Sequence, residues 1–438
     1  MQSYRKAIQD LRMFLILWST QSLSSLGSAM TSFALVIWSY QQNGSALTTS
    51  LLSICSYAPY VAMSIFAGAL SDRWNKKYTM LVSDTLAALS TLAVLFLLKS
   101  GQLRIGHLYL LNAVNGLMNT VQQPASAVSV SLLTPRKYYQ RISALNSLSN
   151  SLITVLTPVI ATALLTFSSI DTVILLDLAT CIVAVSCLAL LITIPETGKG
   201  QTSKAEPLFI SAKKGLQYLH RNRGILDLIL FLAAINLVAS MYNAALPAML
   251  LSRKNGGKAI LGMVNTCAGL ATLVGSVLVS LAPPPRSRVR VICNALLFSM
   301  STENLVLALG RTPLAWCIGA ILGWIFIPVM NANMDALLRS YIPVEVQGRV
   351  YSARNALQFF TIPLGYFLGG LLVDTILEPL MASQAQDSIL VALVGSGKGS
   401  GAAILYLIIA VLGVMVCLIF RRDRQLWALE DRNPHGTV

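Results

Sequence analysis

The sequence predicts an all-α integral membrane protein with twelve transmembrane helices in two pseudo-symmetric six-helix bundles. Three observations lead to this prediction: a low content of charge, twelve long apolar runs and an internal repeat. Of the 438 residues, 55% are hydrophobic and only 11% are charged, whereas about 25% of the residues of an ordinary soluble domain are charged. So few charged side chains cannot cover the surface of soluble domains of this total length.

The apolar runs have the length of membrane-spanning helices, which need about 20 predominantly apolar residues to cross the hydrocarbon core. Each run is continuous, unlike the alternating pattern of a transmembrane β-strand, and this excludes a membrane β-barrel. The runs lie near residues 14–39, 48–70, 78–98, 107–133, 143–167, 172–194, 226–250, 259–282, 291–309, 313–338, 352–376 and 402–420.

The net charge of +15 follows from topology, because cytoplasmic loops of membrane proteins collect Lys and Arg. Most of the 32 basic residues fall in the terminal segments and in every second loop. This bias predicts a multi-pass protein of the cytoplasmic membrane, embedded in the lipid bilayer, with both termini in the cytoplasm. Nucleic acid is therefore not an expected partner.

An internal repeat divides the chain into two bundles, 1–195 and 226–438. Ser143-Ala144-x-Asn146 at the start of the fifth run is matched by Ser352-Ala353-x-Asn355 at the start of the eleventh. Parallel six-span repeats are typical of secondary transporters. Residues 196–225 between the bundles are expected to form a cytoplasmic linker whose second part is an amphipathic helix or simply a solvated basic segment.

The cysteine and histidine residues favour neither a metal site nor an enzyme. All seven cysteines fall inside apolar runs, without a CxxC pair or a neighbouring histidine. The three histidines lie at run edges or in aqueous segments, and no nucleophile–base arrangement is visible. We therefore expect a protein that is not an enzyme and that uses no cofactor.

The loop between the second and third runs carries a motif, GALSDRWNKKYTML. It resembles the loop signature of the major facilitator superfamily, which begins G-x-L-a-D-r-x-G. Asn75 replaces the second glycine of that pattern and is expected to adopt the left-handed turn, which Asn tolerates. The resemblance implies that this loop acts as a conformational switch. The residues that match are Gly68, Asp72, Arg73, Lys76 and Lys77.

Longer segments resemble bacterial macrolide-efflux exporters, among them WSTQSLSSLGSAMTSFALVIWSYQQNGSA, VEVQGRVYSARNAL, IPLGYFLGGLLVDTILEPLMA and GSGKGSG. This resemblance implies a monomeric antiporter of the multidrug type that takes a small-molecule substrate and protons and confers antibiotic resistance. The alternatives are a dedicated natural-product, siderophore or lipid carrier, an importer of the same fold, and a membrane sensor. ATP-driven transport is excluded because the glycine-rich segment lacks the phosphate-binding pattern G-x-x-x-x-G-K-[ST].

Acidic residues inside spans are costly and are functional candidates. The candidates for proton coupling are Glu303, Asp84, Asp335 and Asp177. The structural alternatives are a hydrogen bond within the bundle for Glu303 and bracing of the loop beside Asp72 for Asp84. For Asp335 the alternative is an ion pair with Arg354 or Arg339 at the inner gate. The fourth run also departs from many proton antiporters, because it lacks the arginine of their R-x-x-q-G pattern.

In the superfamily, the first, fourth, seventh and tenth spans line the substrate cavity. Their polar side chains here are expected either to face that cavity or to form hydrogen bonds between helices. With aromatic and Met side chains nearby, such a cavity suits a hydrophobic or amphipathic solute. The candidates are Gln21, Asn115, Asn119, Gln122, Gln123, Asn236, Tyr242, Asn243, Trp324, Asn331 and Asn333.

Overall fold

The computed structural model describes residues 11–135, 138–195 and 216–431. Within these ranges, the side chains at 64–73, 139–141, 143–144, 339, 344–349, 351–352 and 431 are not described. The described residues are almost entirely helical and contain no strand. A helix, or a pair of helices separated by a short break, coincides with each of the twelve apolar runs.

The described chain is that of a multi-pass membrane protein. Eleven of its helical segments are long and apolar enough to cross a membrane. The helix over the fourth run, α5 (Ile105–Leu133), is not among them and is rich in Asn and Gln. Large apolar side chains are exposed on the helix surfaces, such as Phe96 at 72% and Phe167 at 90%. Hydrocarbon chains of lipid are the natural environment for such side chains.

The chain divides into two compact units, residues 1–36 with 55–208 and residues 37–54 with 209–438. The first unit contains most of two helices, α2 (Arg12–Asn43) and α3 (Ala46–Arg73). It also contains α4 (Lys76–Lys99), α5, α6 (Tyr139–Phe167) and α7 (Ile170–Leu190). The tip of the α2–α3 hairpin belongs to the second unit.

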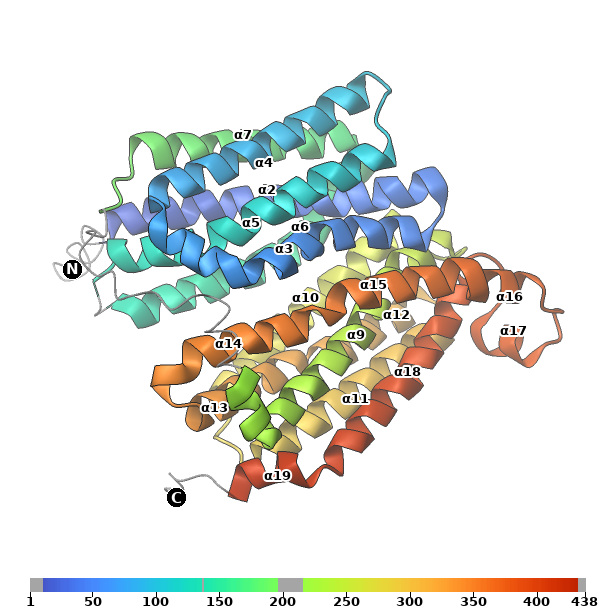
Figure 1. Cartoon of the computed structure of the whole chain (residues 1–438). Coiled ribbons are helices and arrows are strands. Elements are labelled where there is room, and N and C mark those ends of the chain that lie inside the picture. The colour runs from blue at the N-terminus through green and yellow to red at the C-terminus, as the bar shows by residue number, and fades with distance from the viewer. Residues whose placement is uncertain (1–10, 136–137, 196–215, 432–438) are drawn as a thin grey trace. The chain divides into compact units, whose positions relative to one another are not determined.

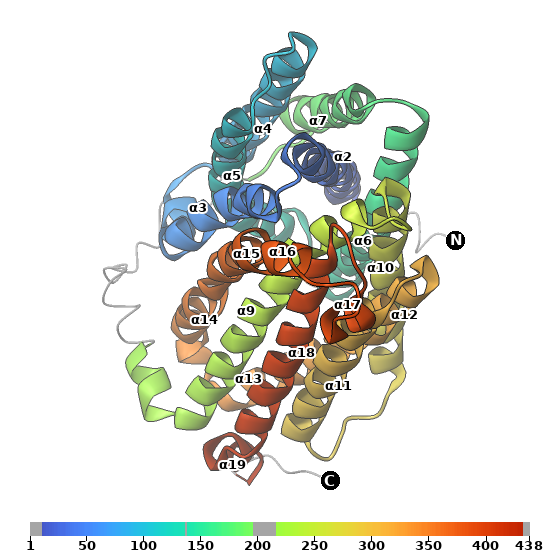
Figure 2. The ribbon, with the colours of Figure 1, turned by 90° about the vertical axis from the view of Figure 1, so that its right-hand side faces the viewer.

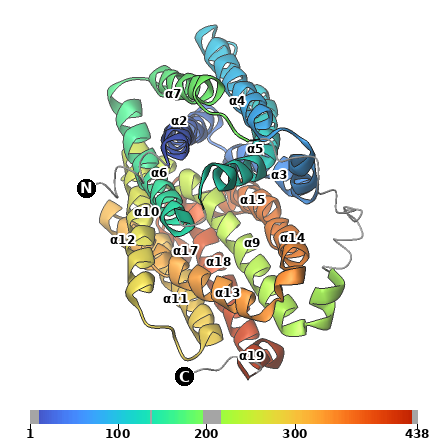
Figure 3. The same cartoon turned by 90° about the vertical axis from the view of Figure 1, so that its left-hand side faces the viewer.

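The helices of the first unit surround α2 (Figure 1). α4 packs against both α5 and α7, and the views from two opposite sides place α2 among these three helices (Figures 2 and 3). Apolar contacts hold one end of this arrangement together, where Leu17 of α2 meets Met80 of α4 and Leu188 of α7. Each of these three side chains is at most 2% exposed, so their burial stabilises the unit.

The second unit begins with α9 (Arg223–Ser252), α10 (Lys258–Leu281) and α11 (Arg288–Leu309). Two of the predicted spans are interrupted. The tenth consists of α12 (Pro313–Trp324) and α13 (Ile327–Tyr341), and the eleventh begins with α14 (Val344–Phe359) and α15 (Thr361–Leu372). Pro328 and Pro363 lie just after the two breaks, and proline cannot donate the backbone hydrogen bond that would continue a helix.

The eleventh span continues as a π-helical turn, η2 (Val373–Leu377), and α16 (Glu378–Ala382). The short α17 (Ile389–Val394) leads to the last span, α18 (Ser400–Arg421), and to α19 (Arg424–Asp431). The glycine-rich segment forms the turn before α18, where Gly395, Gly397 and Gly399 all have positive φ angles. Its place is fixed by Glu378, whose Oε1 accepts a hydrogen bond of 2.9 Å from the backbone N–H of Gly399.

The α2–α3 hairpin tip is held within the second unit by hydrogen bonds of Tyr40 and Asp374. The Tyr40 hydroxyl lies 2.6 Å from the Ser252 Oγ atom. The Asp374 carboxylate accepts hydrogen bonds from the backbone N–H groups of Ala46 and Leu47, at 3.0 and 2.9 Å. Asp374 thus caps the N-terminus of α3, where backbone donors have no partner within the helix.

The linker lies largely outside the described residues. Of the predicted amphipathic segment, residues 216–221 are helical, and residues 196–215 are not described. The separation of the chain into 1–195, 196–225 and 226–438 therefore stays a prediction.

Candidate functional site

The first unit encloses a polar pocket of about 340 Å³. Its wall is formed by α2, α3, α4, α5 and α7, which contribute mainly hydroxyl, amide and carboxyl groups. Polar groups inside a membrane protein must face protein or water rather than lipid. The polar lining residues are Gln21, Ser24, Ser25, Ser28, Thr31, Ser32, Ser56, Asp84, Thr91, Asn112, Asn115, Asn119, Gln122, Asp177 and Cys181.

Asp84 joins three helices at this pocket. Its side chain on α4 is 7% exposed, and its two carboxylate oxygens accept hydrogen bonds from side-chain amides. Gln21 Nε2 on α2 donates to Oδ2 at 2.8 Å, and Gln122 Nε2 on α5 donates to Oδ1 at 2.5 Å. These neutral donors stabilise the charged carboxylate without neutralising it. Protonation of either oxygen would place a hydroxyl donor opposite one amide N–H group, and that amide would have to flip or move.

Asp177 is the second buried carboxylate of the pocket. It lies on α7, is 2% exposed, and its Oδ1 atom accepts a hydrogen bond of 2.9 Å from the Ser28 hydroxyl on α2. The close approach of the two helices depends on Gly27, because a Cβ atom there would lie 2.6 Å from the Thr180 hydroxyl oxygen. Gly27 therefore brings the polar side of α2 against Asp177.

Several predicted cavity residues line this pocket, together with the predicted acids Asp84 and Asp177. They are Gln21, Asn115, Asn119 and Gln122, while Gln123 does not belong to the lining. Asn115 Oδ1 is buried and has no hydrogen-bond partner. The helical spacing of the polar residues on α5 made this group predictable. The participation of Asp84 and Asp177 from neighbouring helices in the same pocket was not.

The second unit places Glu303 in a different environment. Its side chain on α11 is 4% exposed and lies beside the side chains of Tyr242 and Trp324. Tyr406 packs edge-to-face on Tyr242, with ring centroids 5.3 Å apart. The carboxylate fills the space in front of Gly323, where an added Cβ atom would overlap it. Two predicted cavity residues therefore surround this predicted proton-coupling residue.

The remaining asparagines of the second unit have different surroundings. Asn236 Nδ2 donates to the backbone oxygen of Gln358 at 3.2 Å and joins α9 to α14. Asn243 and Asn333 each donate to a backbone oxygen one turn earlier in their own helix, and Asn331 is exposed. These contacts match the helix-bonding alternative for Asn236, whereas the amides of Asn243 and Asn333 bond locally.

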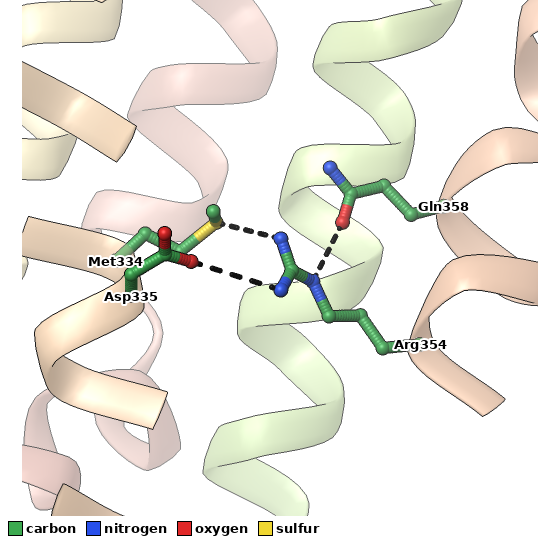
Figure 4. A network of polar contacts seen from close by, with 4 residues as sticks. All are labelled: Met334, Asp335, Arg354 and Gln358. Atoms are coloured by element: carbon green, nitrogen blue, oxygen red, sulfur yellow. Dashed lines mark hydrogen bonds and ion pairs between the residues drawn. The ribbon is translucent and has the colours of Figure 1, made fainter. Parts of the chain in front are cut away.

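Asp335 forms an ion pair with Arg354, which is the structural role that was expected for it if it does not couple transport to protons. Its Oδ1 atom lies 3.8 Å from Nη1 of Arg354, and Arg354 Nε donates to Gln358 Oε1 at 3.0 Å (Figure 4). The Asp335 side chain is 53% exposed, so water screens this pair. Asp335 thus differs from the buried acids that lack a basic partner.

The switch loop is described in part. The side chains of Gly68, Asp72 and Arg73 lie outside the described residues, so their roles stay predictions. Lys77 Nζ donates to the backbone oxygen of Ala189 at 2.8 Å, and Lys76 Nζ donates to that of Trp74 at 3.1 Å.

The expectation of a left-handed turn at Asn75 is wrong. Asn75 has φ −65° and ψ 120°, an extended conformation, and it caps α4. Its Oδ1 atom accepts hydrogen bonds from the backbone N–H groups of Lys77 and Tyr78. An N-cap requires this extended backbone and a short polar side chain, and both are present here.

Asp374 caps the N-terminus of α3, and the sequence alone did not predict this role. Its donors at the start of α3 lie more than 300 positions earlier in the chain. The sequence Gly44-Ser45 before α3 predicts a helix start, but it does not identify the residue that accepts hydrogen bonds from the first backbone N–H groups of the helix.

No group of three or more potential metal ligands is found among the described residues.

Comparison with protein families decides the identity of the fold. Residues 17–365 match the model of the Major Facilitator Superfamily. The chain belongs to this superfamily. Its helical architecture, its buried polar groups and the motif after the second span are those of a membrane transporter, which is not an enzyme and which carries small-molecule substrates across the bilayer.

Two relatives of this chain are named as efflux proteins. Macrolide efflux protein A of Streptococcus pyogenes is 22% identical over 367 residues, which cover 83% of this chain and 90% of that protein. Multidrug efflux pump Tap of Mycolicibacterium fortuitum is 23% identical over 365 residues, covering 80% and 86%. Among solved structures, the nucleoside transporter NupG has a TM-score of 0.67 at 14% identity, covering 93% and 98%. This last similarity concerns the fold alone.

Proposed function

We propose that this secondary transporter exports hydrophobic or amphipathic compounds of the macrolide or multidrug type in exchange for protons. The observation that carries the proposal is the pocket of the first unit, which holds two buried carboxylates, Asp84 and Asp177, and no basic side chain in its lining. Ionisable residues inside membrane-spanning segments are costly and are typical of proton relays in transporters. The efflux relatives support the direction of transport.

The proposed coupling follows from the hydrogen bonds of Asp84. When the carboxylate is charged, it holds Gln21 of α2 and Gln122 of α5 against α4. A proton on one oxygen replaces an acceptor by a donor, so the amide bonded to that oxygen must either flip and accept through its own oxygen or leave Asp84. Proton binding would then change the charge of the pocket and the hydrogen bonds that join α4 to α2 or α5.

Glu303 is proposed as a second protonation site. The carboxyl group lies among uncharged side chains, and its Oε1 atom is buried without a hydrogen-bond partner. A buried charge without a partner is unfavourable, and protonation removes that cost. Glu303 would carry a proton without contacting the exported compound.

The topology is part of the proposal. We propose that the protein lies in the cytoplasmic membrane. Both termini would face the cytoplasm, because basic residues favour the inner side. We further propose that a monomer is sufficient, since the proposed protonation sites each lie within one unit of a single chain.

The test is ethidium or macrolide accumulation in inverted membrane vesicles that are energised with a proton gradient. We expect accumulation that stops when an uncoupler dissipates the gradient. Vesicles with the same amount of folded protein and no accumulation of any such compound would contradict the proposed function. Accumulation that continues unchanged after addition of the uncoupler would contradict proton coupling alone.

A further inference from the structure

We propose that the pocket of the first unit binds the positively charged group of an organic cation, an ammonium or other onium group, against Asp177 and Asp84. This inference rests on the proposed function and deepens it by naming the substrate class. The compound would enter the pocket with its cationic group, and the same two carboxylates would receive protons when the compound is absent.

The first argument is the charge of the lining. Buried carboxylates are ordinarily paired with a base or a metal. The residues that line the pocket include two carboxylates and one thiol, that of Cys181, but no Lys, Arg or His. The described wall therefore carries negative charge without a basic side chain to balance it. A cation from solution can provide the balancing positive charge.

The second argument is the presence of polar atoms that have no partner in the protein. Thr31 lines the pocket and is only 6% exposed, and its hydroxyl lacks a hydrogen-bond partner. It lies near Asp177 without meeting hydrogen-bonding geometry. Asn115 Oδ1 is the second such atom in the lining. Buried polar atoms are nearly always hydrogen-bonded, so these two side chains retain hydrogen-bonding capacity that a ligand in the pocket could use.

The shape of the pocket favours an organic cation over a metal ion. A volume of about 340 Å³ lies at the lower end of the range for small-molecule sites. A bare metal ion instead requires several oxygens gathered at about 2.0–2.6 Å. Both oxygens of Asp84 already accept amide N–H groups, which point at the positions where a metal would bind.

The lining also has an apolar part that an organic cation can contact. Val94, Leu108, Leu111 and Met118 belong to the wall formed by α4 and α5. An onium group is large and weakly hydrated, and its carbon substituents can pack on such side chains while its charge faces the carboxylates. Both carboxylates belong to the same lining, so either one can serve as the counter-ion of the onium group.

The test measures the charge preference of the pocket directly. A variant without the seven native cysteines receives one reporter, Ser25→Cys, because Ser25 lines the pocket and is exposed within it. Its reaction rates are measured with two thiosulfonate reagents, one carrying a trimethylammonium group and one carrying a sulfonate. Each rate is divided by the rate of that reagent with free mercaptoethanol.

We expect the cationic reagent to react about tenfold faster than the anionic one after this correction, since a cleft of one charge sign concentrates ions of the opposite sign. Tetraphenylphosphonium is expected to slow the reaction, whereas tetraphenylborate, of matched size and opposite charge, is not. Asp84→Asn with Asp177→Asn should abolish the preference, and Asp177→Glu should retain it. Retention by Asp177→Glu separates charge from a merely structural effect.

Equal corrected rates for the two reagents in the otherwise unchanged chain would overturn the inference, as would protection by sodium ions but not by tetraphenylphosphonium. The result is independent of the proposed function because no proton gradient is involved. If the charge preference and the protection by tetraphenylphosphonium are observed but no export is measured, only the proposed export function is refuted. If proton-driven export is measured without any charge preference, only the inferred cation site is refuted.

Discussion

The two units of the chain bury acidic side chains in opposite ways. In the first unit, Asp84 and Asp177 line a pocket of about 340 Å³ and accept hydrogen bonds from amides and a hydroxyl. In the second, Glu303 is packed beside Tyr242 and Trp324. Its carboxylate occupies the space that a side chain at position 323 would need, and Gly323 leaves this space free. Both sites lack a basic partner among the residues described around them.

The difference suits two tasks that the proposed proton-coupled exporter would perform. A pocket with room beside its carboxylates can hold either protons or a cationic compound, so the two can compete for the same charge. A carboxyl group that fills its own space can accept a proton but no larger ligand. We therefore assign competition between substrate and proton to the first unit and proton binding alone to the second.

The largest expected effect comes from removing the charge of Asp177. Asp177→Asn should lower proton-driven export in vesicles about a hundredfold, equivalent to ~2.7 kcal/mol, because the substituted side chain can neither release a proton nor pair with a cation. Asp171→Asn is the matched control, since Asp171 lies on the same helix and does not line the pocket. Export by Asp177→Asn equal to that of the control would break the assignment.

Gly323→Ala should disturb the Glu303 site through packing alone. The new methyl group would overlap the carboxylate, and such overpacking costs about 1–3 kcal/mol. Thermal unfolding of the purified protein measures the loss. Gly319→Ala on the same helix is the control, because its nearest neighbouring atom would lie at 3.2 Å. Combining Gly323→Ala with Glu303→Ala should restore part of the stability, and a strictly additive loss would contradict the packed site.

Asp374→Asn tests an acid that caps a helix instead of facing a pocket. The substitution weakens the acceptor for the N–H groups of Ala46 and Leu47 and should cost about 1 kcal/mol of stability. Asp387→Asn in the loop after α16 is an exposed control. A change in the dependence of export on pH, rather than in thermal unfolding, would show that Asp374 belongs with the proton sites.

The smallest effect is expected at Asp335. Its ion pair with Arg354 is 3.8 Å long and half exposed on the acidic side, and exposed pairs contribute about 0–1 kcal/mol. Asp335→Asn should therefore leave the unfolding temperature and proton-driven export nearly unchanged. A loss of export as large as that of Asp177→Asn would return Asp335 to the coupling residues.

The fold could be predicted from the sequence to a large extent. Long apolar runs and their spacing determine where helices must lie in a bilayer, and each run coincides with a helix or a broken pair. The breaks in the tenth and eleventh spans went unpredicted. Pro328 and Pro363 lie beside them, but four other prolines lie inside unbroken helices, so proline alone does not predict a break. The extended Asn75 cap was missed because a motif with glycine at that position suggested a turn.

The candidate site could be predicted only in its composition. The sequence identifies Gln21, Gln122 and Asp84 as polar residues inside spans, but it does not show that the two glutamines, 63 and 38 positions from Asp84, donate to the same carboxylate. Gly27 and Gly323 illustrate the same limit. Each makes space for a carboxylate on another helix, at Asp177 and at Glu303, and a single sequence contains no signal for such pairing.

The most direct test of the comparison is proton release on ligand binding in purified protein. Tetraphenylphosphonium is added to the protein in weakly buffered detergent solution near neutral pH, and a pH indicator records the protons released. We predict release by the unchanged protein and by Glu303→Gln, and none by Asp84→Asn combined with Asp177→Asn. Undiminished release by that double variant, or loss of release in Glu303→Gln alone, would contradict the assignment of substrate–proton competition to the pocket of the first unit.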